Sequence, residues 1–523
     1  MTMGADGTFD FIIVGAGSAG CVLADRLTRD GRHRVLLIEA GPRDSSPFIR
    51  MPRGFGRTLA DPALAYYYAV EGQDGAPGAP WVRGRTLGGS SAVNGMIYVR
   101  GQREDYDGWA ANGATGWDGA AMAEAFAELE RELPIGIQTH ETPLTRAITA
   151  AGVAVGLRQR SGAQEVDGEG IGPTPCNIVH GQRQSAAHVF LRPAERRANL
   201  RVETGVTVDA LLMEGRRVTG VRAGERVWRA SGEVIVCAGA IESPALLQRS
   251  GIGPADTLAA AGVALRHVLP GVGRNLREHK LVMLQHRLAV PLGDNRAFSG
   301  WRLWRNAALY GLLRRGPLAR TYDLNAFARS RPDVERPDVQ ISFSAFSLDL
   351  SAPALRFEPF AGMQMFGYPL RPTSSGRIDI RDGRAATPPR IRPDYLSTDH
   401  DRQITVDMVR LMRRLAAAPP LAGIVAEETH PGAAMSEDEA SILAAAHRDQ
   451  SCAHAVGTCR MGASDDEQAV VDARLRARGL DGLRIMDCSV MPTQVSGNTN
   501  APVMAMAVRA ARLILEDARQ SVA

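Results

Sequence analysis

The feature that most constrains the fold is a glycine-rich turn near the N-terminus, Gly15-Ala-Gly-Ser-Ala-Gly20. It follows a short apolar run, residues 9–14, and precedes residues 18–29, whose apolar side chains recur at helical spacing. A second apolar run, residues 35–38, ends in Glu39. A buried strand, a glycine turn, a helix and a second buried strand predict a βαβ unit in a parallel sheet.

Each part of this unit suits a dinucleotide. Gly15 permits the sharp turn, Gly17 lets the backbone approach a pyrophosphate, and Gly20 lets the helix pack close to the sheet. Ser18 and Ala19 open the helix, where free N–H groups and the helix dipole favour an anion. Glu39 lies where a carboxylate can accept hydrogen bonds from ribose hydroxyls. The turn therefore predicts a dinucleotide cofactor but does not separate FAD from NAD.

Size and charge limit the class of protein. A chain of 523 residues, 45% of them hydrophobic, is long for one domain, and two domains are expected. The formal net charge is +4, and Lys280 is the single lysine. The arginines are scattered among Asp and Glu residues rather than clustered, so we predict no nucleic-acid partner.

The cysteines and the apolar runs indicate a compartment. The six cysteines are widely spaced and form no Cys-x-x-Cys pair, which predicts free thiols, a reducing environment and no metal site. The N-terminus shows no basic segment followed by an apolar one. No apolar run reaches the roughly eighteen residues of a membrane-spanning helix. We therefore predict a soluble, cytoplasmic protein without a transmembrane segment.

Further along the chain the pattern changes. Short strands are predicted at 200–210, 218–222, 227–229 and 233–237. Residues 284–415 are rich in aromatic residues and prolines and contain alternating strands, for example at 339–346 and 376–381. A final helix is predicted from Ala501 to about Asp517. This order predicts a Rossmann-like α/β domain joined to an α+β domain built on an antiparallel sheet with helices.

A second glycine-rich segment favours FAD. Residues 84–101 combine paired glycines and serines with the apolar residues Val93, Met96 and Ile97. Small residues let the backbone lie flat against a planar ligand, and the apolar residues indicate that the segment is buried.

One histidine carries the chemistry. His454 lies in the stretch Ser451-Cys-Ala-His-Ala-Val-Gly-Thr-Cys-Arg-Met-Gly462. An imidazole titrates near neutral pH and suits the transfer of a proton to or from an oxygen. Together with a redox cofactor, it suggests alcohol oxidation.

These segments resemble the glucose–methanol–choline (GMC) family of FAD-dependent oxidoreductases, particularly its choline-dehydrogenase-like bacterial branch. Residues 84–101 are similar to the first signature of the family, and residues 239–253 to the second. Shorter matches are Pro270-Gly-Val-Gly-Arg-Asn-Leu276, Asp487-Cys-Ser-Val-Met-Pro492 and Ser496-Gly-Asn-Thr-Asn-Ala-Pro502. The resemblance implies an FAD-binding domain of about residues 1–155, 200–285 and 450–523, and a substrate-binding domain of about 156–199 and 286–449.

The resemblance also implies where FAD lies. Gly15, Gly17, Gly20 and Glu39 would hold its ADP half, and Val208, on a strand after residue 200, would meet the adenine. The remaining contacts implied for the flavin and its ribityl chain are Gly88, Ser91, Asn94, Gly95 and Asp487. Asn500 is either a helix cap or a flavin contact. The position that carries a covalent flavin link in some relatives is Val93 here, so FAD is predicted to be non-covalent.

For the reaction, the resemblance implies that His454 takes the hydroxyl proton while a hydride passes to the flavin N5. Asn498, which cannot act as a base, would orient the substrate oxygen. Cys452 is either a substrate contact or a small apolar filler. The segment Glu278-His279-Lys280 is predicted to be structural, and His447 and Asp449 are given no role.

The aromatic residues of about 284–370 either line the substrate cavity or belong to the core. A primary alcohol, aryl or aliphatic, oxidised to the aldehyde is the predicted reaction. A non-redox lyase of the cyanohydrin type and a flavin photoenzyme acting on fatty acids are the alternatives. Whether O₂ or another electron acceptor reoxidises the flavin, and whether the protein is a monomer or a homodimer, stay open.

Overall fold

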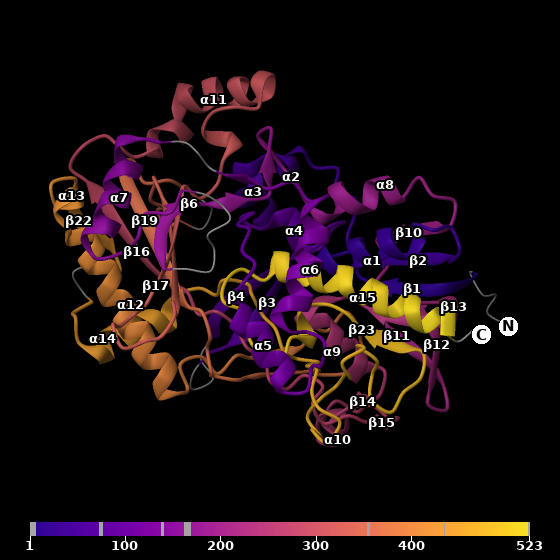
Figure 1. Cartoon of the computed structure of the whole chain (residues 1–523). Helices are drawn as coiled ribbons and strands as arrows, with labels where there is room; N and C mark the ends of the chain where they lie inside the picture. Colours follow the sequence, from indigo (N-terminus) through magenta and orange to yellow (C-terminus); the bar gives the residue numbers. More distant parts are fainter. Residues whose placement is uncertain are drawn as a thin grey trace.

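The chain folds around two large sheets that lie side by side (Figure 1). The computed structural model describes residues 7–72, 77–137, 141–161, 169–352, 356–432 and 435–520. Within these residues helices and strands are mixed along the chain, in agreement with the predicted class of α/β and α+β domains. No helix in the described ranges is long and apolar enough to cross a membrane.

The first sheet is mainly parallel and has the strand order β10–β2–β1–β13–β12–β11, with β23 paired to β13. Strand β1 pairs in parallel with both β2 and β13, whereas β12 and β11 extend the sheet with antiparallel pairs. Its strands are β1 (Thr8–Val14), β2 (Val35–Glu39), β10 (Leu200–Thr204), β11 (Ala210–Glu214), β12 (Arg217–Ala223), β13 (Arg226–Val236) and β23 (Leu483–Ile485).

Two helices from opposite ends of the chain pack together beside this sheet. Helix α1 (Ser18–Thr28) connects β1 to β2 and completes the predicted βαβ unit. Helix α15 (Asn500–Gln520) packs against α1 and against α6 (Gly119–Glu130). Strand β2 is buried along its whole length, as expected for a parallel strand in a covered sheet.

Two strand predictions are wrong in their bounds. Residues 200–210 do not form one strand: β10 ends at Thr204, where Gly205 takes a left-handed φ of +72° and turns the chain. Val208 therefore lies in the loop between β10 and β11 rather than on a strand. The strands predicted at 227–229 and 233–237 are one continuous strand, β13.

The second sheet is built from antiparallel pairs, and helices cover one of its faces (Figure 1). In the order β22–β16–β19–β18–β17–β6, its strands are Val425–His430, Val282–Leu288, Gly362–Pro369, Val339–Ser344, Leu324–Ala328 and Gly170–Pro173. Helix α12 (Asp399–Ala417) packs on β16, β18 and β19. Around it lie α7 (Pro143–Ala154), α13 (Pro419–Ala422) and α14 (Glu439–Arg448).

A smaller sheet has the order β20–β21–β3–β4, with β20 (Arg377–Asp379), β21 (Arg390–Arg392), β3 (Ala65–Glu71) and β4 (Pro77–Gly84). Strand β4 ends where the second glycine-rich segment begins, and α4 (Ser90–Val93) follows. The paired short strands are β5 (Gly136–Ile137) with β7 (Pro175–Cys176), β8 (Ile178–Val179) with β9 (Gln182–Arg183), and β14 (Ile252–Gly253) with β15 (His267–Val268).

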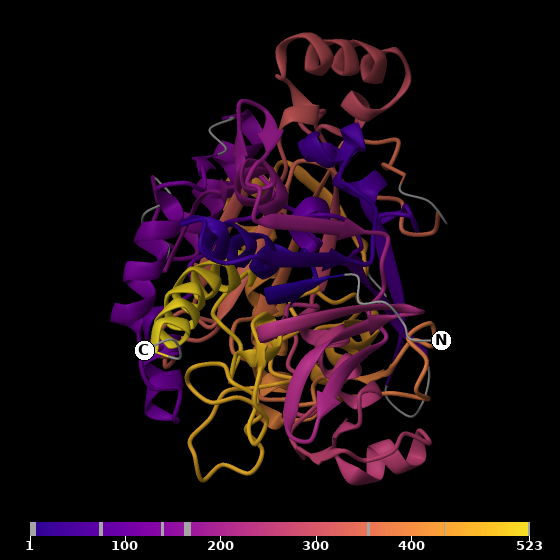
Figure 2. The ribbon, with the colours of Figure 1, turned by 90° about the vertical axis from the view of Figure 1, so that its right-hand side faces the viewer.

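The other α-helices are α2 (Pro47–Arg50), α3 (Phe55–Leu59), α5 (Arg103–Ala111), α8 (Arg192–Ala194), α9 (Gly239–Arg249), α10 (Ala255–Ala260) and α11 (Gly300–Leu313). Helix α11 stands clear of the body at the top of Figures 1 and 2.

Candidate active site

A single large cavity connects the glycine turn with His454. Its volume is about 1670 Å³, which exceeds the roughly 300–1,000 Å³ of an ordinary small-molecule site. It opens at the carboxyl ends of β1 and β2, where α/β sheets bind their ligands, and reaches the second sheet at Gln364, Phe366 and Tyr368 of β19. The cavity therefore has room for a cofactor and a substrate together.

The glycine turn has the geometry of a pyrophosphate cradle. Gly15 takes a φ of +105°, and a Cβ there would lie 2.5 Å from the carbonyl oxygen of Cys237. A Cβ on Gly20 would lie 1.9 Å from the carbonyl oxygen of Gly15, so only glycine lets α1 approach this closely. A Cβ on Gly17, by contrast, would meet no protein atom within 4 Å. Because Gly17 lines the cavity, that free space is where phosphates would lie.

Glu39 is held in place at the end of β2. Its two carboxylate oxygens accept hydrogen bonds from the Ala16 N–H at 2.9 Å and the Gly41 N–H at 2.8 Å. Burial raises the pKa of Glu39, and these backbone hydrogen bonds oppose the rise. The carboxylate lines the cavity beside Gly15, as a ribose ligand requires.

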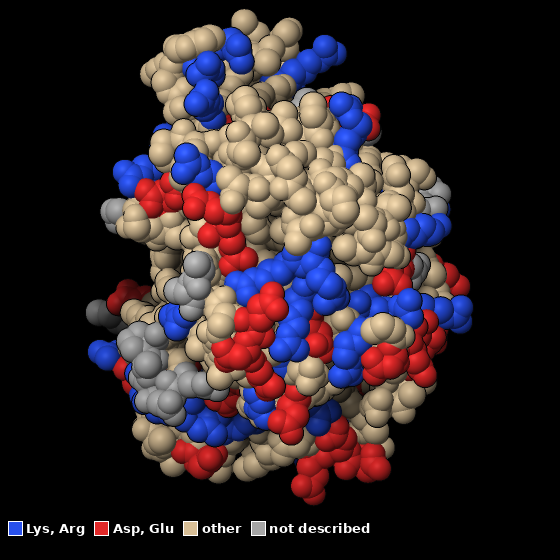
Figure 3. Space-filling model, turned by 90° about the vertical axis from the view of Figure 1, so that its left-hand side faces the viewer, with Lys and Arg blue, Asp and Glu red and all other residues tan. Residues whose placement is uncertain are grey.

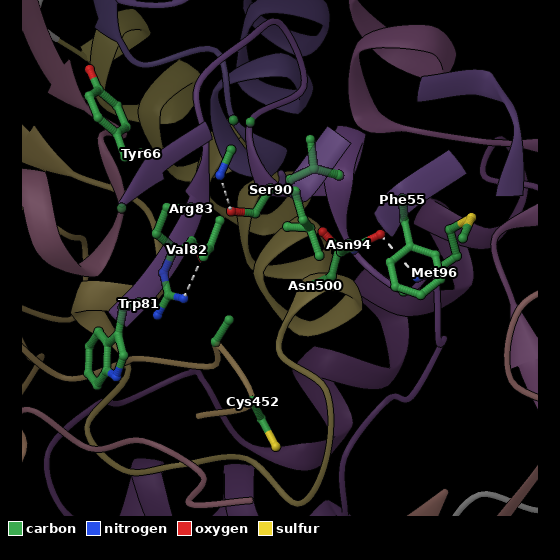
Figure 4. A pocket seen from close by; sticks show the side chains of 18 of the residues that line it. Phe55, Tyr66, Trp81, Val82, Arg83, Ser90, Asn94, Met96, Cys452 and Asn500 are labelled. Carbon is green, nitrogen blue, oxygen red and sulfur yellow. Dashed lines mark hydrogen bonds between the residues drawn. The ribbon is translucent and has the colours of Figure 1, made fainter. Parts of the chain in front are cut away.

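The second glycine-rich segment lies against the same cavity, in part through the predicted residues. Gly89, Ser90, Asn94 and Gly95 line the cavity, and Asn94 and Ser90 accept hydrogen bonds from the N–H groups of Met96 and Gly84 (Figure 4). Gly88 and Ser91, predicted as cofactor contacts, are not among the lining residues. The Ser91 hydroxyl instead donates to the Gly88 carbonyl at 2.6 Å and accepts from the Ala186 N–H at 3.0 Å.

The helices α1, α9 and α15 begin at residues that line the cavity, at Ser18, Gly239 and Asn500 respectively. Asn500 Oδ1 accepts a hydrogen bond from Ser18 Oγ at 2.7 Å, which ties two of these helix starts together. Asp487 lines the cavity too, and its carboxylate accepts hydrogen bonds from Gly239 N at 2.9 Å and Ser243 Oγ at 2.5 Å. The N-termini of these helices, which favour anions, therefore lie at the cavity wall.

Of the other predicted cofactor contacts, Val208 and Ala19 line the cavity, whereas Gly20 does not. Gly20 acts through packing instead, because it lies against Gly15. Val93 lines the cavity.

His454 and Asn498 meet on the cavity wall. Asn498 Nδ2 lies 3.1 Å from His454 Nε2. Two side chains fix the orientation of the Asn498 amide. Its Oδ1 accepts hydrogen bonds from Gln340 Nε2 at 3.1 Å and from Tyr368 Oη at 3.4 Å. The amide N–H therefore points at the imidazole, as the predicted base-and-orienting pair requires.

The tautomer of His454 follows from a chain of hydrogen bonds. A carbonyl oxygen only accepts, so the Nε2 of His279, 3.0 Å from the Leu370 carbonyl, carries a proton. Burial lowers the pKa of His279 to about 3, so this ring is neutral and its Nδ1 is an acceptor. His454 Nδ1, 2.9 Å away, must therefore carry its proton, which leaves the lone pair on Nε2.

The His454 loop is anchored through Glu278. Its Oε1 accepts hydrogen bonds from the N–H groups of His454 at 2.7 Å and His279 at 2.9 Å, and its Oε2 accepts from Arg83 of β4 at 3.2 Å. Gln494 Nε2 donates to the His454 carbonyl at 3.0 Å. The segment 278–280, predicted as merely structural, thus positions the imidazole. Its sequence signal is weak, because His279 and His454 are far apart in the chain.

The electrostatics of the site favour a neutral imidazole. Burial, the neighbouring His279 and the charge of Arg83 lower the pKa of His454 well below its ordinary value of 6.5. Burial raises the pKa of the Cys452 thiol well above its usual value, so this thiol is not an anionic nucleophile. Cys452 lines the cavity beside His454.

Beyond this pair the cavity is mostly apolar and aromatic, lined among others by Phe55, Met96, Leu281, Met283, Tyr322, Phe346 and Phe366. The lining carboxylates in the described residues are Glu39, Asp61, Glu242 and Asp487, and none comes from the second sheet. Two arginines, Arg53 and Arg356, line this end as well. The guanidinium carbon of Arg53 lies 4.8 Å from the ring centre of Phe346.

A dinucleotide cradle joined to a cavity that holds a buried imidazole is typical of a redox enzyme. Comparison with known proteins gives the family. The family model described as GMC oxidoreductase matches residues 9–281 with its N-terminal part and 372–507 with its C-terminal part. The chain belongs to the GMC oxidoreductase family.

Similar proteins extend over almost the whole chain. An oxygen-dependent choline dehydrogenase of Vibrio vulnificus is 38% identical over 97% of this chain and 94% of its own length. An alcohol dehydrogenase [acceptor] of Pseudomonas putida is 34% identical over 97% of this chain and 96% of its own. The crystal structure of pyridoxine 4-oxidase from Mesorbium loti superposes with a TM-score of 0.84 at 31% identity, covering 96% of this chain and 98% of the other. The protein is therefore an FAD-dependent oxidoreductase acting on CH–OH groups, and the predicted fold class is confirmed.

Proposed function

We propose that this protein oxidises a primary, uncharged alcohol, aryl or aliphatic, to the aldehyde, with His454 as the general base. The observation that carries the proposal is the pair of atoms His454 Nε2 and Asn498 Nδ2, 3.1 Å apart on the cavity wall. A hydroxyl placed against both atoms donates its hydrogen to Nε2 and accepts a hydrogen bond from Nδ2. This is the arrangement that removes the proton from an alcohol and fixes its oxygen.

The residues divide the work. His454 takes the hydroxyl proton at Nε2 while its own Nδ1–H is held by His279. Asn498 holds the substrate oxygen and is itself oriented by Gln340 and Tyr368. Bound FAD would supply the hydride acceptor, since its N5 would accept the hydride that leaves the carbinol carbon. The apolar wall around Tyr322 and Phe366 excludes water from the developing carbonyl.

The cavity wall supports an uncharged substrate rather than choline. A quaternary ammonium is stabilised by aromatic faces and by carboxylates. The aromatic faces are present, but none of the lining carboxylates in the described residues comes from the second sheet, where the guanidinium of Arg53 lines the cavity instead. Choline is therefore the control substrate for this proposal, with aryl and straight-chain primary alcohols as the test substrates.

FAD is proposed to be non-covalent, because Val93 stands at the position that carries the flavin link in some relatives. Acid precipitation of the protein tests this: the yellow cofactor is expected in the supernatant, and flavin that stays with the pellet contradicts it. A cytoplasmic location and a monomeric or homodimeric state remain predictions.

An anaerobic screen of primary alcohols for bleaching of the flavin absorbance tests the reaction. A redox enzyme reduces its flavin with one substrate class, whereas a cyanohydrin lyase leaves the flavin oxidised with all of them. Decarboxylation of a fatty acid only under blue light would identify the photoenzyme alternative. Peroxide formation in air, with and without an artificial acceptor, then separates an oxidase from a dehydrogenase.

A further inference from the structure

Helix α11 carries an apolar stripe that faces away from the protein. Its outer residues Trp301, Trp304, Ala308 and Leu312 recur at the spacing of one helix face, and Trp301, Trp304 and Leu312 are 63%, 78% and 83% exposed. The opposite face holds the helix to the protein through buried Asn306 and Tyr310. A surface helix of a water-exposed protein shows the reverse arrangement, with its apolar stripe inward.

The helix stands clear of the body, so this stripe is not the edge of a core. Figures 1 and 2 show α11 projecting at the top of the molecule. It is anchored from its inner face, since Asn306 Nδ2 donates to the Ala297 carbonyl at 2.9 Å and Tyr310 Oη to the Arg50 carbonyl at 3.4 Å. An exposed apolar patch of this kind marks an interaction site, so we expect a binding partner for this face of α11.

The charges around the stripe indicate what that partner is. Residues 295–319 contain five arginines and no Asp or Glu, although the whole chain carries 57 acidic residues. Arg302 and Arg305 flank the stripe, each with its guanidinium carbon 5.3 Å from the ring centre of Trp301, and Arg314 and Arg315 follow the helix. In Figure 3 blue basic atoms stand among tan ones on the lobe at the top. An exposed Trp/Leu stripe bordered by arginines is typical of helices that lie in the headgroup layer of an anionic membrane.

The same helix reaches the active-site cavity. Leu303, Trp304 and Ala307 line that cavity at its outer end. Trp304 thus belongs both to the exposed stripe and to the lining of the cavity that Phe346 also lines.

We propose that α11 is a membrane-docking helix that inserts its Trp301–Trp304–Leu312 stripe into the headgroup layer of a bilayer containing anionic lipid. The helix lies in the plane of the membrane and does not cross it. Docking places the outer end of the cavity at the lipid surface, where an apolar alcohol partitions. This last consequence rests on the proposed function; the docking itself does not.

Vesicle flotation of the purified full-length protein tests the proposal. Binding is expected to vesicles of phosphatidylcholine with about 30% phosphatidylglycerol, and to weaken strongly with phosphatidylcholine alone. The double variant Trp301→Ser/Leu312→Ser is expected to lose most of this binding. Arg302→Gln and Arg305→Gln are each expected to weaken it about fivefold. The matched control is Leu265→Ser/Val268→Ser, which removes two residues 48% and 53% exposed near β15 and leaves binding unchanged.

The chain supplies its own optical probe. Trp81, Trp109, Trp117 and Trp228 are at most 2% exposed, so Trp301 and Trp304 are the two tryptophans that can change environment at a surface. Anionic vesicles should shift the emission to shorter wavelength in the wild type, and by less in Trp301→Ser/Leu312→Ser. Neither Trp301 nor Leu312 lines the cavity, so flavin reduction by a short alcohol in buffer should be the same in both proteins.

Three results would overturn the proposal: no binding to either vesicle, equal binding by Trp301→Ser/Leu312→Ser, or a dimer in light scattering that this variant dissociates and that does not bind vesicles. The dimer would assign the stripe to a second copy of the chain. Vesicle binding without any alcohol-dependent flavin reduction would leave the docking intact and remove the proposed function instead.

Discussion

His279 Nδ1 lies 2.9 Å from His454 Nδ1, and the Leu370 carbonyl behind His279 fixes which ring gives and which accepts the proton. The contact makes His279 a positioning residue: it holds the imidazole of His454 in the tautomer whose Nε2 lone pair faces Asn498. The base of the proposed reaction is thus prepared before substrate arrives.

Replacing His279 by Leu removes this acceptor. The limiting rate of flavin reduction is expected to fall about ten- to a hundredfold, as for other groups that orient a reactive residue. KM should stay within about threefold because the substrate oxygen is still held by Asn498. Stopped-flow reduction over a range of alcohol concentrations separates the two parameters.

His286→Leu is the matched control for that change. Like His279, His286 is a buried histidine; it lies on β16. Burial lowers the pKa of His286 to about 4, but its Nδ1 has no hydrogen-bond partner among the described residues. Its rate should equal that of the wild type. Equal losses in both variants would mean that His279 acts only through packing.

The pH dependence of the reaction follows from the lowered pKa of His454. The base works when it is neutral, and burial favours the neutral form. The rate of flavin reduction should therefore be flat above the ordinary histidine value of 6.5 and fall only at lower pH. A half-maximal rate at pH 7 or above would contradict this direction.

Asn498→Asp tests the same base from the other side. A carboxylate beside Nε2 favours the protonated imidazole and raises the pKa of His454. The fall in the rate of flavin reduction at acidic pH should therefore begin at a higher pH. Asn498→Ala removes the amide without adding charge. It should lower the rate of flavin reduction about tenfold or more, but the pH at which the rate falls should stay the same. If the pH at which the rate falls shifts equally in both variants, residue 498 does not contact the base directly.

Gly17→Ala tests the phosphate cradle. The backbone φ of −76° suits alanine, and its Cβ would meet no protein atom, so the FAD-free protein should keep its stability. In the holoprotein the methyl group would compete with the phosphates at a cost of about 1–3 kcal/mol. FAD affinity should then fall about ten- to a hundredfold, measured by fluorescence titration of the apoprotein.

Gly108→Ala, in α5, is its control, because that Cβ also meets nothing within 4 Å and Gly108 is not among the cavity-lining residues. Unchanged FAD affinity in Gly17→Ala would place the pyrophosphate elsewhere.

The sequence predicted those parts of the site whose signal is local. The glycine turn, the strand before it and Glu39 follow each other within one βαβ unit, so their geometry could be inferred from spacing. His454 and Asn498 came from the resemblance to the family, and the structure brings them together. Where Gly88 and Ser91 were expected, Gly89 and Ser90 line the cavity, because the phase of a turn is set by tertiary contacts such as that of Ser91 with Ala186.

Other features depend on contacts between distant parts of the chain. His279 meets His454 because the loops that carry them pack against each other through Glu278. The outward stripe of α11 has the same periodicity as an inward one, and only the packing of Asn306 and Tyr310 tells which face is exposed. The bounds of the two domains remain a prediction.

The most direct test of the proposed function compares wild type with His454→Ala in anaerobic flavin reduction by the best primary alcohol of the screen. The variant should still bind FAD, since the glycine turn and Glu39, which are proposed to hold the ADP half, are unchanged. Its reduction rate should fall about 10²- to 10⁴-fold, the usual worth of a general base. A variant that reduces its flavin within about tenfold of the wild-type rate would contradict the assignment of His454 as that base.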